Sequence, residues 1–425
     1  LLENYLIMGE LSLDGTLQPI RGVLPIALAA RNAGFKGVIV PIQNAREAAV
    51  VDNIEVYGLS NLQEVVRLLN GTQDFLPTQV DTAAEFQQNA FSSELDFSDV
   101  RGQENVRRAM EVAAAGGHNM LMVGPPGAGK SMMAKRLSSI LPPLTLEEAL
   151  ETTKIYSVAG MMSNKKESSG KSSALIVQRP FRSPHHTVTD IALIGGGGNP
   201  QPGEISFAHN GVLFLDELPE YKRSVLEVMR QPLEDRHISV TRAKKTVDYP
   251  ASFMLVAAMN PCPCGHYGEN NPAHPCTCTP SQIHRYLSRI SGPLLDRIDI
   301  QCDIQPVPYS LLKETQPSES SVTMRERVIT ARNIQKQRFA NYNATHSPIH
   351  CNAQMSPKLV REYCKLSDEC DRLLAFAMEK MGFSARAYDR ILKVARTIAD
   401  LAQSTDILPA HLLEAINYRT LDKAD

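Results

Sequence analysis

The sequence predicts an α/β protein with a parallel β-sheet at its core, a helical C-terminal region and a smaller α+β region at its N-terminus. From Phe97 to about residue 305, apolar strand-like runs alternate with helical patterns, which is typical of a parallel sheet covered by helices. Helical periodicity then dominates, over residues 321–339, 356–381, 384–403 and 409–418. Residues 1–70 alternate between strand-like and helix-like segments.

Length, composition and charge exclude several classes of protein. The chain has 425 residues, which at about 150 residues per domain suggests about three domains. A hydrophobic share of 43% is enough for sizeable cores and excludes a disordered chain. The net charge is −2, so no basic coat covers the protein, and any contact with DNA must come from a local patch. No run of about 18 apolar residues is present, so we expect no membrane span.

The N-terminal region contains several recognisable elements. Residues 9–17 are typical of a hairpin that turns at Asp14-Gly15. A helix, a buried strand and a second helix are expected at residues 24–33, 37–41 and 61–69. The stretch that follows is rich in Gln, Thr, Ser and Asp and lacks periodicity, which indicates a linker. We therefore divide the chain into residues 1–70, a linker at 71–97, a core at 98–305 and a helical region at 306–425.

A glycine-rich loop follows the apolar run Met120–Val123 and matches the phosphate-binding pattern G-x-x-x-x-G-K-[ST] in full. Its residues are Gly124, Pro125, Pro126, Gly127, Ala128, Gly129, Lys130 and Ser131. Glycines let backbone N–H groups surround phosphate oxygens, and the start of the next helix favours the same anion. Lys130 would reach the β- and γ-phosphates and Ser131 would ligate Mg²⁺, so we expect an ATP site.

Two further apolar runs end in side chains that such a site needs. The run 212–215 is followed by Asp216 and Glu217. On a strand neighbouring the phosphate loop, Asp216 would hold Mg²⁺ through water and Glu217 would polarise the attacking water. The run 253–259 ends at Asn260, whose amide could align that water against the γ-phosphate.

Two inserts interrupt this core. The interval from Lys130 to Asp216 is longer than a strand–helix–strand unit needs, and it includes residues 179–186 and the glycine run 195–198. Residues 238–247 are typical of a hairpin with a basic tip. The tip residues Arg242, Lys244 and Lys245 could bind DNA phosphates without reading sequence, or could form an ordinary solvated turn.

Four of the eight cysteines fall within one short stretch, as two C-x-C pairs. They are Cys262, Cys264, Cys276 and Cys278. Four thiolates can close a structural Zn²⁺ site, which is our expectation. Free or transiently oxidised thiols, or a ligand drawn from His266, His274 or His284, are the alternatives. Because a large chain with clustered cysteines does not resemble a disulfide-stapled secreted domain, we expect a cytoplasmic protein.

These motifs occur together with four longer segments, RPFRSPHHTVTDIALIGGGG, GVLFLDELPEY, AAMNPCPCG and ISGPLLDRIDI. In this combination the sequence resembles the Mg-chelatase-related AAA+ family, in its YifB/ComM branch, over essentially the whole chain. The resemblance implies an AAA+ core with a helical lid, assembled into an ATP-driven ring, usually a hexamer, with the inserts directed at the pore. It also implies a DNA helicase that promotes branch migration during natural transformation.

The resemblance implies two further arginines at the ATP site. The family's arginine finger falls at Arg297, the last residue of the Leu-Leu-Asp-Arg motif, with Arg289 in reserve. The alternative is that Arg297 only pairs with Asp296 or Asp299. The second sensor falls at Arg386 in Ser-Ala-Arg, where it would touch a γ-phosphate of its own or a neighbouring subunit, unless it is only a solvated helix charge.

Residues 9–69 resemble the latter part of a Lon-type peptidase domain, in a branch that is not a peptidase. Leu24 falls where Lon carries its catalytic lysine, and an apolar side chain cannot activate a serine. We therefore expect a scaffold or docking surface here. His185 and His186, in the first insert, could face the pore or serve only a structural role.

Three functions remain open from the sequence. A DNA translocase or branch-migration helicase is the first, with DNA, ATP, Mg²⁺ and structural Zn²⁺ as its partners and cofactors. A chelatase-type or protein-remodelling ATPase is the second, and an ATP-gated assembly scaffold is the third. Stimulation of ATP hydrolysis by branched or single-stranded DNA would separate the first from the other two.

Overall fold

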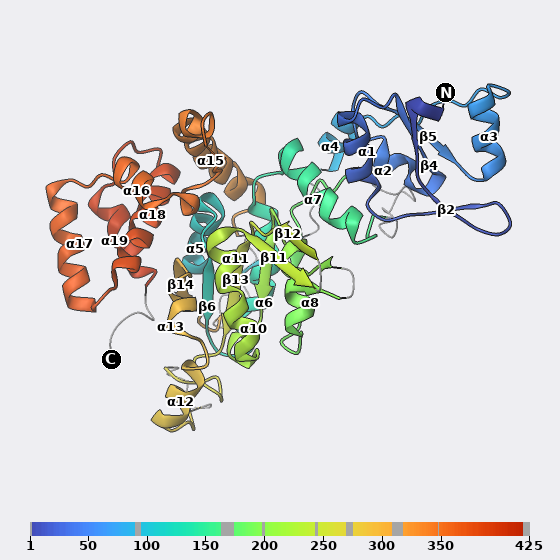
Figure 1. The fold of residues 1–425 in the computed structure, drawn as a ribbon. Helices are drawn as coiled ribbons and strands as arrows, with labels where there is room; N and C mark the ends of the chain where they lie inside the picture. Colours follow the sequence, from blue (N-terminus) through green and yellow to red (C-terminus); the bar gives the residue numbers. More distant parts are fainter. Residues whose placement is uncertain are drawn as a thin grey trace.

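The fold is described from a computed structural model. It describes residues 2–89, 95–162, 174–197, 200–242, 245–268, 275–307, 318–346 and 348–419. A central sheet domain separates the N-terminal region, in blue, from the C-terminal helices, in red (Figure 1). Every helix within the described ranges is too short or too polar to cross a bilayer.

Five parallel strands form the central sheet, in the order β14-β6-β13-β10-β7. They are β6 (Met120–Val123), β7 (Phe181–Arg182), β10 (Val212–Leu215), β13 (Met254–Met259) and β14 (Ile300–Asp303). Because all five are parallel, the residues that follow β6, β10 and β13 meet at one edge of the sheet. One expectation was wrong: the acidic strand β10 does not neighbour β6, because β13 pairs with both and lies between them.

Successive side chains of the strands enter two different apolar cores, one on each face. Met120 and Met122 join a core with α5 (Glu104–Gly116) and α6 (Lys130–Ile140). Leu121 and Val123 join a second core on the other face, with α10 (Arg223–Val228) and α13 (Gly292–Leu295). A parallel sheet covered on both faces confirms the predicted α/β class.

The N-terminal region has its own parallel sheet, in the order β1-β4-β5, with a small hairpin beside it. Its strands are β1 (Tyr5–Ile7), β2 (Glu10–Leu11), β3 (Leu17–Gln18), β4 (Gly37–Pro41) and β5 (Glu55–Leu59). Its helices are α1 (Val23–Asn32), α2 (Ala45–Ala48) and α3 (Leu62–Asn70). These elements confirm the expected hairpin, the buried strand and both helices. A helix that the sequence did not predict, α4 (Thr82–Asn89), lies within the expected linker.

The C-terminal region is helical, as predicted. Its helices are α15 (Ser321–Asn343), α16 (Pro357–Tyr363), α17 (Asp368–Met381), α18 (Ala385–Leu401) and α19 (Pro409–Asn417). The helix expected over residues 356–381 is broken in two, since the Ser367 hydroxyl accepts a hydrogen bond from the Cys370 N–H and starts α17. Helices α15 and α18 pack against α5, which joins this region to the central sheet.

The expected inserts are short elements around the sheet. Between β6 and β10 lie α7 (Leu146–Val158), α8 (Asp190–Ile194), β8 (Gly195–Gly196), β9 (Gln201–Pro202) and α9 (Glu204–Phe207). After β10 come α11 (Arg230–Asp235), the hairpin strands β11 (His237–Arg242) and β12 (Lys245–Pro250), and α12 (Pro280–Leu287). Helix α7 packs against α1, so the first insert connects the N-terminal region to the central domain (Figure 1).

Candidate functional site

The glycine-rich loop lies at the carboxyl edge of β6 and leads directly into α6. Gly127 and Gly129 have φ angles of 78° and 89°, in the left-handed region that favours glycine. Lys130 folds back under the loop, where its Nζ donates to the carbonyl oxygens of Gly124 at 2.6 Å and Pro125 at 2.8 Å. These contacts hold the ammonium group beneath the curl of backbone that would receive a phosphate.

Side chains from the ends of β10 and β13 meet this loop. The Asn260 Oδ1 accepts a hydrogen bond from Lys130 Nζ at 3.0 Å, and the Ser131 hydroxyl donates to Asp216 Oδ2 at 2.5 Å. Burial lowers the pKa of Lys130, and the nearby charges of Asp216 and Glu217 oppose that shift. The structure therefore gathers the ammonium group, the hydroxyl, the amide and two carboxylates at one edge of the sheet.

Glu217 is held by contacts that the sequence did not reveal. Its φ angle is 53°, an uncommon value for a residue with a side chain, and its N–H donates to Asp216 Oδ1 at 2.9 Å. The carboxylate lies 3.0 Å from Nδ1 of His186, whose ring centroid is 4.1 Å from that of His185. The sequence signalled this contact only through the adjacent histidines, and nothing in their pattern connected them with Glu217.

Arg297 lies at the opposite edge of the sheet from the phosphate loop. Asn119 precedes β6, and its side-chain amide donates to the backbone oxygen of Arg297 at 2.9 Å. The loop follows β6, and four strand residues at about 3.3 Å each separate the two edges by about 13 Å. The Arg297 guanidinium pairs with Glu234 and donates to the Pro293 oxygen at 2.7 Å. Within one subunit, Arg297 therefore does not reach the phosphate loop.

Arg386 lies on the same side of the sheet as Arg297. It is exposed near the start of α18 and forms an ion pair with Asp296 at 3.2 Å. Both partners line the same cavity as Arg297, at the edge opposite the phosphate loop. Within its own subunit Arg386 therefore lies away from the phosphate loop, and of the two expected contacts only the one with a neighbouring subunit's γ-phosphate stays a prediction. The alternative finger, Arg289, instead pairs with Glu220 at 2.9 Å, three residues beyond Glu217.

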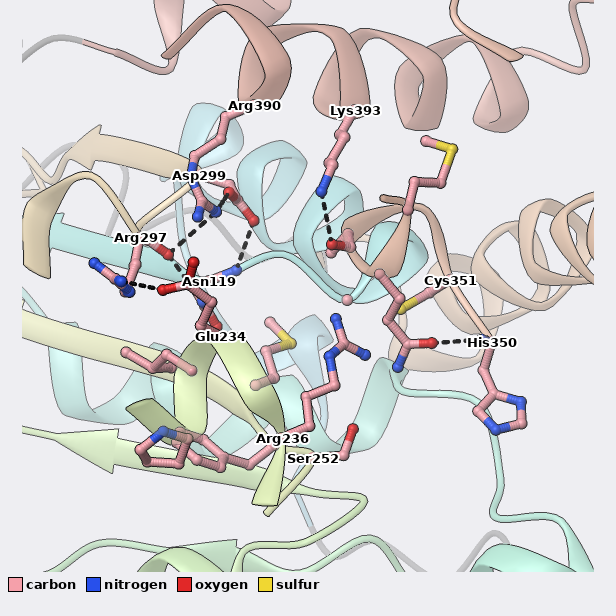
Figure 2. Close-up of a pocket in the computed structure, with 18 of the residues that line it drawn as sticks. Asn119, Glu234, Arg236, Ser252, Arg297, Asp299, His350, Cys351, Arg390 and Lys393 are labelled. Carbon is pink, nitrogen blue, oxygen red and sulfur yellow. Dashed lines mark hydrogen bonds and ion pairs between the residues drawn. The ribbon is translucent and has the colours of Figure 1, made fainter. Parts of the chain in front are cut away.

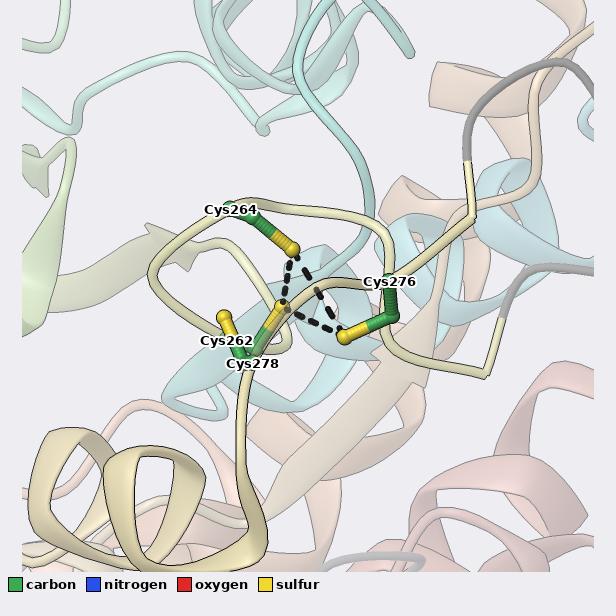
Figure 3. Close-up of side chains that lie close together, drawn as sticks. All are labelled: Cys262, Cys264, Cys276 and Cys278. Carbon is green, nitrogen blue, oxygen red and sulfur yellow. Dashed lines mark hydrogen bonds between the residues drawn. The ribbon is translucent and has the colours of Figure 1, made fainter.

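The four clustered cysteines come together between β13 and α12 (Figure 3). Their sulfur atoms all lie within 4.8 Å of one another, and three of the separations are 3.3, 3.6 and 3.8 Å. These separations fit a tetrahedral site, in which Zn–S bonds of about 2.3 Å place the sulfurs about 3.8 Å apart. Hydrogen bonding from the backbone of His266 lowers the pKa of Cys264 to about 5, which favours its thiolate. Against an opposing backbone hydrogen bond, burial and the neighbouring thiols raise the pKa of Cys276 and of Cys278. His274 lies outside the described residues.

The cysteine loop packs directly on the phosphate loop. A side chain at Gly265 would begin 2.6 Å from Cδ of Pro126, and Gly265 has a φ angle of 89°. Cys262 is fully buried and follows Asn260 by two residues. The position of the cysteine loop therefore affects both the backbone that would receive phosphate and the amide at the end of β13.

The basic hairpin can be placed only in part. Strands β11 and β12 form the expected hairpin, but Lys244 lies outside the described residues, as do the side chains of Arg242 and Lys245.

Leu24 is completely buried in the N-terminal core, and its backbone N–H donates to Glu47 and Ser157. A buried leucine cannot replace a catalytic lysine at that position.

Comparison with known proteins extends over nearly the whole chain. Profiles described as "Magnesium chelatase, subunit ChlI" and "Magnesium chelatase, subunit ChlI C-terminal" match residues 96–312 and 318–419. A third, "Subunit ChlI of Mg-chelatase", matches residues 1–44.

Individual relatives agree with the profiles. The chain is 43% identical to "Competence protein ComM" of Haemophilus influenzae over 99% of this chain and 78% of that protein. It is also 43% identical to "Uncharacterized protein YifB" of Escherichia coli, with the same coverage. "Lon protease 2" of Bacillus subtilis is 30% identical over 35% of this chain and 26% of its own length. The chain therefore belongs to the magnesium chelatase subunit ChlI family of AAA+ ATPases, together with ComM and YifB.

Proposed function

We propose that the chain is a motor that hydrolyses ATP at the edge of the sheet where Lys130, Asp216 and Asn260 meet, and that it uses this energy to move DNA. The observation that carries the proposal is the pair of contacts from Lys130 to Asn260 and from Ser131 to Asp216, which join three strand ends. Phosphoryl transfer depends mainly on positioning and electrostatic stabilisation, which such a convergence supplies.

Each residue at this edge has a task in the proposed reaction. Lys130 exchanges the carbonyl oxygens of Gly124 and Pro125 for phosphate oxygens when ATP binds. Glu217 accepts a hydrogen bond from the attacking water, and His186 orients that carboxylate from 3.0 Å. Asn260 lies where its amide can position the water against the γ-phosphate.

The donor set at the end of the loop fits Mg²⁺, which prefers oxygen ligands. The hydroxyl of Ser131 and the carboxylate of Asp216 lie 2.5 Å apart and would hold the ion. When bound there, Mg²⁺ would offset the negative charge of the β- and γ-phosphates.

The site is incomplete within one subunit. Arg297 and Arg386 lie at the far edge of the sheet, so a head-to-tail ring is the arrangement that would bring them to a neighbour's triphosphate. Six subunits are the number that the family resemblance implies. In this proposal Arg297 supplies the positive charge for the neighbour's transition state, and Arg386 contacts the same phosphate.

DNA is the proposed substrate of the motor. The relative from Haemophilus influenzae is a competence protein, which supports a role in the processing of DNA during natural transformation, and branch migration is the activity we propose. In the sequence, Arg242, Lys244 and Lys245 fall where β11 passes into β12, and basic side chains there could bind phosphates in a ring pore.

Charge reversal at the hairpin tip tests this role. Branched DNA should stimulate ATP hydrolysis by the wild-type protein, and the double change Lys244→Glu and Lys245→Glu should abolish that stimulation without changing the basal rate. Like charges at the tip would repel DNA phosphates, whereas the ATP site lies elsewhere. The measurement is steady-state ATP hydrolysis with and without a Holliday junction.

A matched double reversal controls for the loss of net positive charge. Lys358 and Lys365 are exposed in the C-terminal region, and their change to Glu should leave stimulation intact. Equal basal and DNA-stimulated rates in the wild-type protein would contradict the DNA proposal. A chelatase-type or protein-remodelling ATPase would then be the better interpretation, and the ATP site would remain unaffected.

We further propose that Cys262, Cys264, Cys276 and Cys278 bind one structural Zn²⁺. Four sulfurs leave no open position for catalysis, so the ion would fix the loop that packs on Pro126. Thiolates held in this way are typical of a reducing compartment, which agrees with a cytoplasmic protein.

Elemental analysis tests the zinc proposal. Protein purified without chelator should contain one zinc per chain, and Cys276→Ser should contain far less, because a hydroxyl is a poor ligand for Zn²⁺. Cys364→Ala is the control, since this buried cysteine lies outside the cluster and its loss should leave the zinc content unchanged. A metal-free wild-type preparation would contradict the proposal.

The N-terminal region is proposed to be a scaffold or docking surface. Its core includes Leu175 and Val177 of the first insert, so the N-terminal region packs against a segment of the ATPase domain. The buried position of Leu24 supports a role without peptidase chemistry.

A further inference from the structure

A cavity of 560 Å³ lies at the sheet edge opposite the phosphate loop, between the central domain and the C-terminal helices. Its walls come from the starts of β6 and β13, from the base of the hairpin and from α15 and α18 (Figure 2). Seven basic side chains line it, namely Arg179, Arg236, Arg297, Arg332, Arg386, Arg390 and Lys393. The roles proposed above use only two of them.

Four of the seven cations are neutralised by carboxylates. The ion pairs are Arg179–Glu148, Arg297–Glu234, Arg386–Asp296 and Arg390–Asp299. These pairs account for every lining carboxylate except Asp389, for which no ion pair is found within the described part of the chain. The three remaining cations therefore outnumber the one remaining carboxylate, and the lining carries a net positive charge.

The three remaining cations converge on the cavity from separate elements. Arg236 follows α11 at the root of the hairpin, and among the described residues its guanidinium contacts no hydrogen-bond acceptor (Figure 2). Lys393 on α18 points down into the cavity, and within the described ranges its ammonium group donates to the Ala353 oxygen alone, at 3.2 Å. The guanidinium of Arg332 on α15 donates to the backbone oxygens of Ala114 and His350 and to no carboxylate in the part of the chain that the structure describes.

We propose that this cavity is a binding site for a small phosphate-type anion, held by Arg236, Arg332 and Lys393 and separate from the phosphate loop of the same subunit. Half-buried cations without a carboxylate partner carry an unfavourable desolvation cost, which a polyvalent oxyanion would offset with charge-assisted hydrogen bonds. Guanidinium groups match the geometry of phosphate oxygens, and the ammonium group of Lys393 adds a third point of attachment.

The electrostatic environment agrees with this assignment. Burial lowers the pKa of Lys393, and the positive charges of Arg390 and Arg236 contribute to the same shift, although the carboxylates of Asp299 and Asp389 oppose it. Burial also lowers the pKa of Arg236. An anion in the cavity would relieve this mutual repulsion. It would also connect the root of the hairpin to two helices of the C-terminal region.

Pyrophosphate is a suitable probe, and binding can be measured by titration calorimetry on the full chain. A Lys130→Ala background removes binding at the phosphate loop, so any remaining site is a different one. We expect one pyrophosphate per chain in this background. Arg236→Gln and Lys393→Gln should each weaken its affinity by about tenfold or more, which is the usual effect of the loss of one hydrogen bond to a charged group.

Arg361→Gln is the matched control, because Arg361 is exposed on α16 and does not line the cavity. It should leave the affinity unchanged, and thermal unfolding of each variant should show that the fold is retained. No pyrophosphate binding to Lys130→Ala, or equal binding by Arg236→Gln, would overturn the proposal. Binding that requires an intact phosphate loop on a second copy would also overturn it, because the anion would then be the nucleotide of a neighbour. The proposed ATP hydrolysis does not depend on any of these results.

Discussion

A Glu217→Gln variant should bind ATP about as well as the wild-type protein but hydrolyse it about 10²–10⁴ times more slowly, the usual contribution of a general base. The residues that would bind the phosphates, Lys130 and Ser131, form their hydrogen bonds with Asn260 and Asp216. A change at Glu217 therefore leaves those hydrogen bonds in place. The amide keeps the shape of the side chain and its contact with His186 but cannot polarise water in the same way. Equilibrium binding of a fluorescent ATP analogue and steady-state phosphate release measure the two effects separately.

Glu220→Gln provides the control for this change. Glu220 lies three residues further along and pairs with Arg289 at 2.9 Å, on the surface of the same turn. Its neutralisation should leave the basal rate within about twofold of the wild-type rate, since an exposed ion pair contributes little. A Glu217→Gln variant with normal turnover would contradict the assignment, and so would one that loses ATP binding.

The sequence placed the side chains of the proposed ATP site close together because their positions depend on local patterns. Polar residues that directly follow buried strands must meet at one edge of a parallel sheet, so Asp216 and Asn260 could be placed near Lys130 without coordinates. The order of the strands was harder to predict from the sequence. It depends on which apolar surfaces pair, and the hydrophobic runs of β10 and β13 are too similar to show that β13 lies beside β6.

Contacts between distant segments could not be derived from the sequence. His186 meets Glu217 because the first insert folds back over the end of β10, and no periodicity or spacing encodes that approach. The cavity with Arg236, Arg332 and Lys393 has the same origin, since it draws one side chain from each of three elements. Such sites appear only when the long-range packing of the chain is known.

Arg297 should be as important for ATP hydrolysis as Glu217, but it should act at the ATP site of a neighbouring subunit. Its replacement by Ala should lower ATP hydrolysis about 10³-fold or more, because an arginine finger stabilises charge in the transition state. The guanidinium lies at the sheet edge opposite its own phosphate loop, where it pairs with Glu234. The loss of the Glu234 ion pair should leave the fold intact, which thermal unfolding can check.

Mixed assemblies distinguish action on a neighbour from a structural effect. Arg297→Ala and Lys130→Ala subunits should each be inactive alone, but after dissociation and co-assembly they should regain activity. A site is complete wherever an intact phosphate loop faces an intact Arg297, which random mixing gives at roughly a quarter of the interfaces of a head-to-tail ring. Glu217→Gln mixed with Lys130→Ala is the matched control, because both defects belong to a subunit's own site and no interface can be complete. Recovery of ATP hydrolysis in the first mixture alone would show that Arg297 acts across the interface. If both mixtures stay inactive, Arg297 does not act on a neighbour.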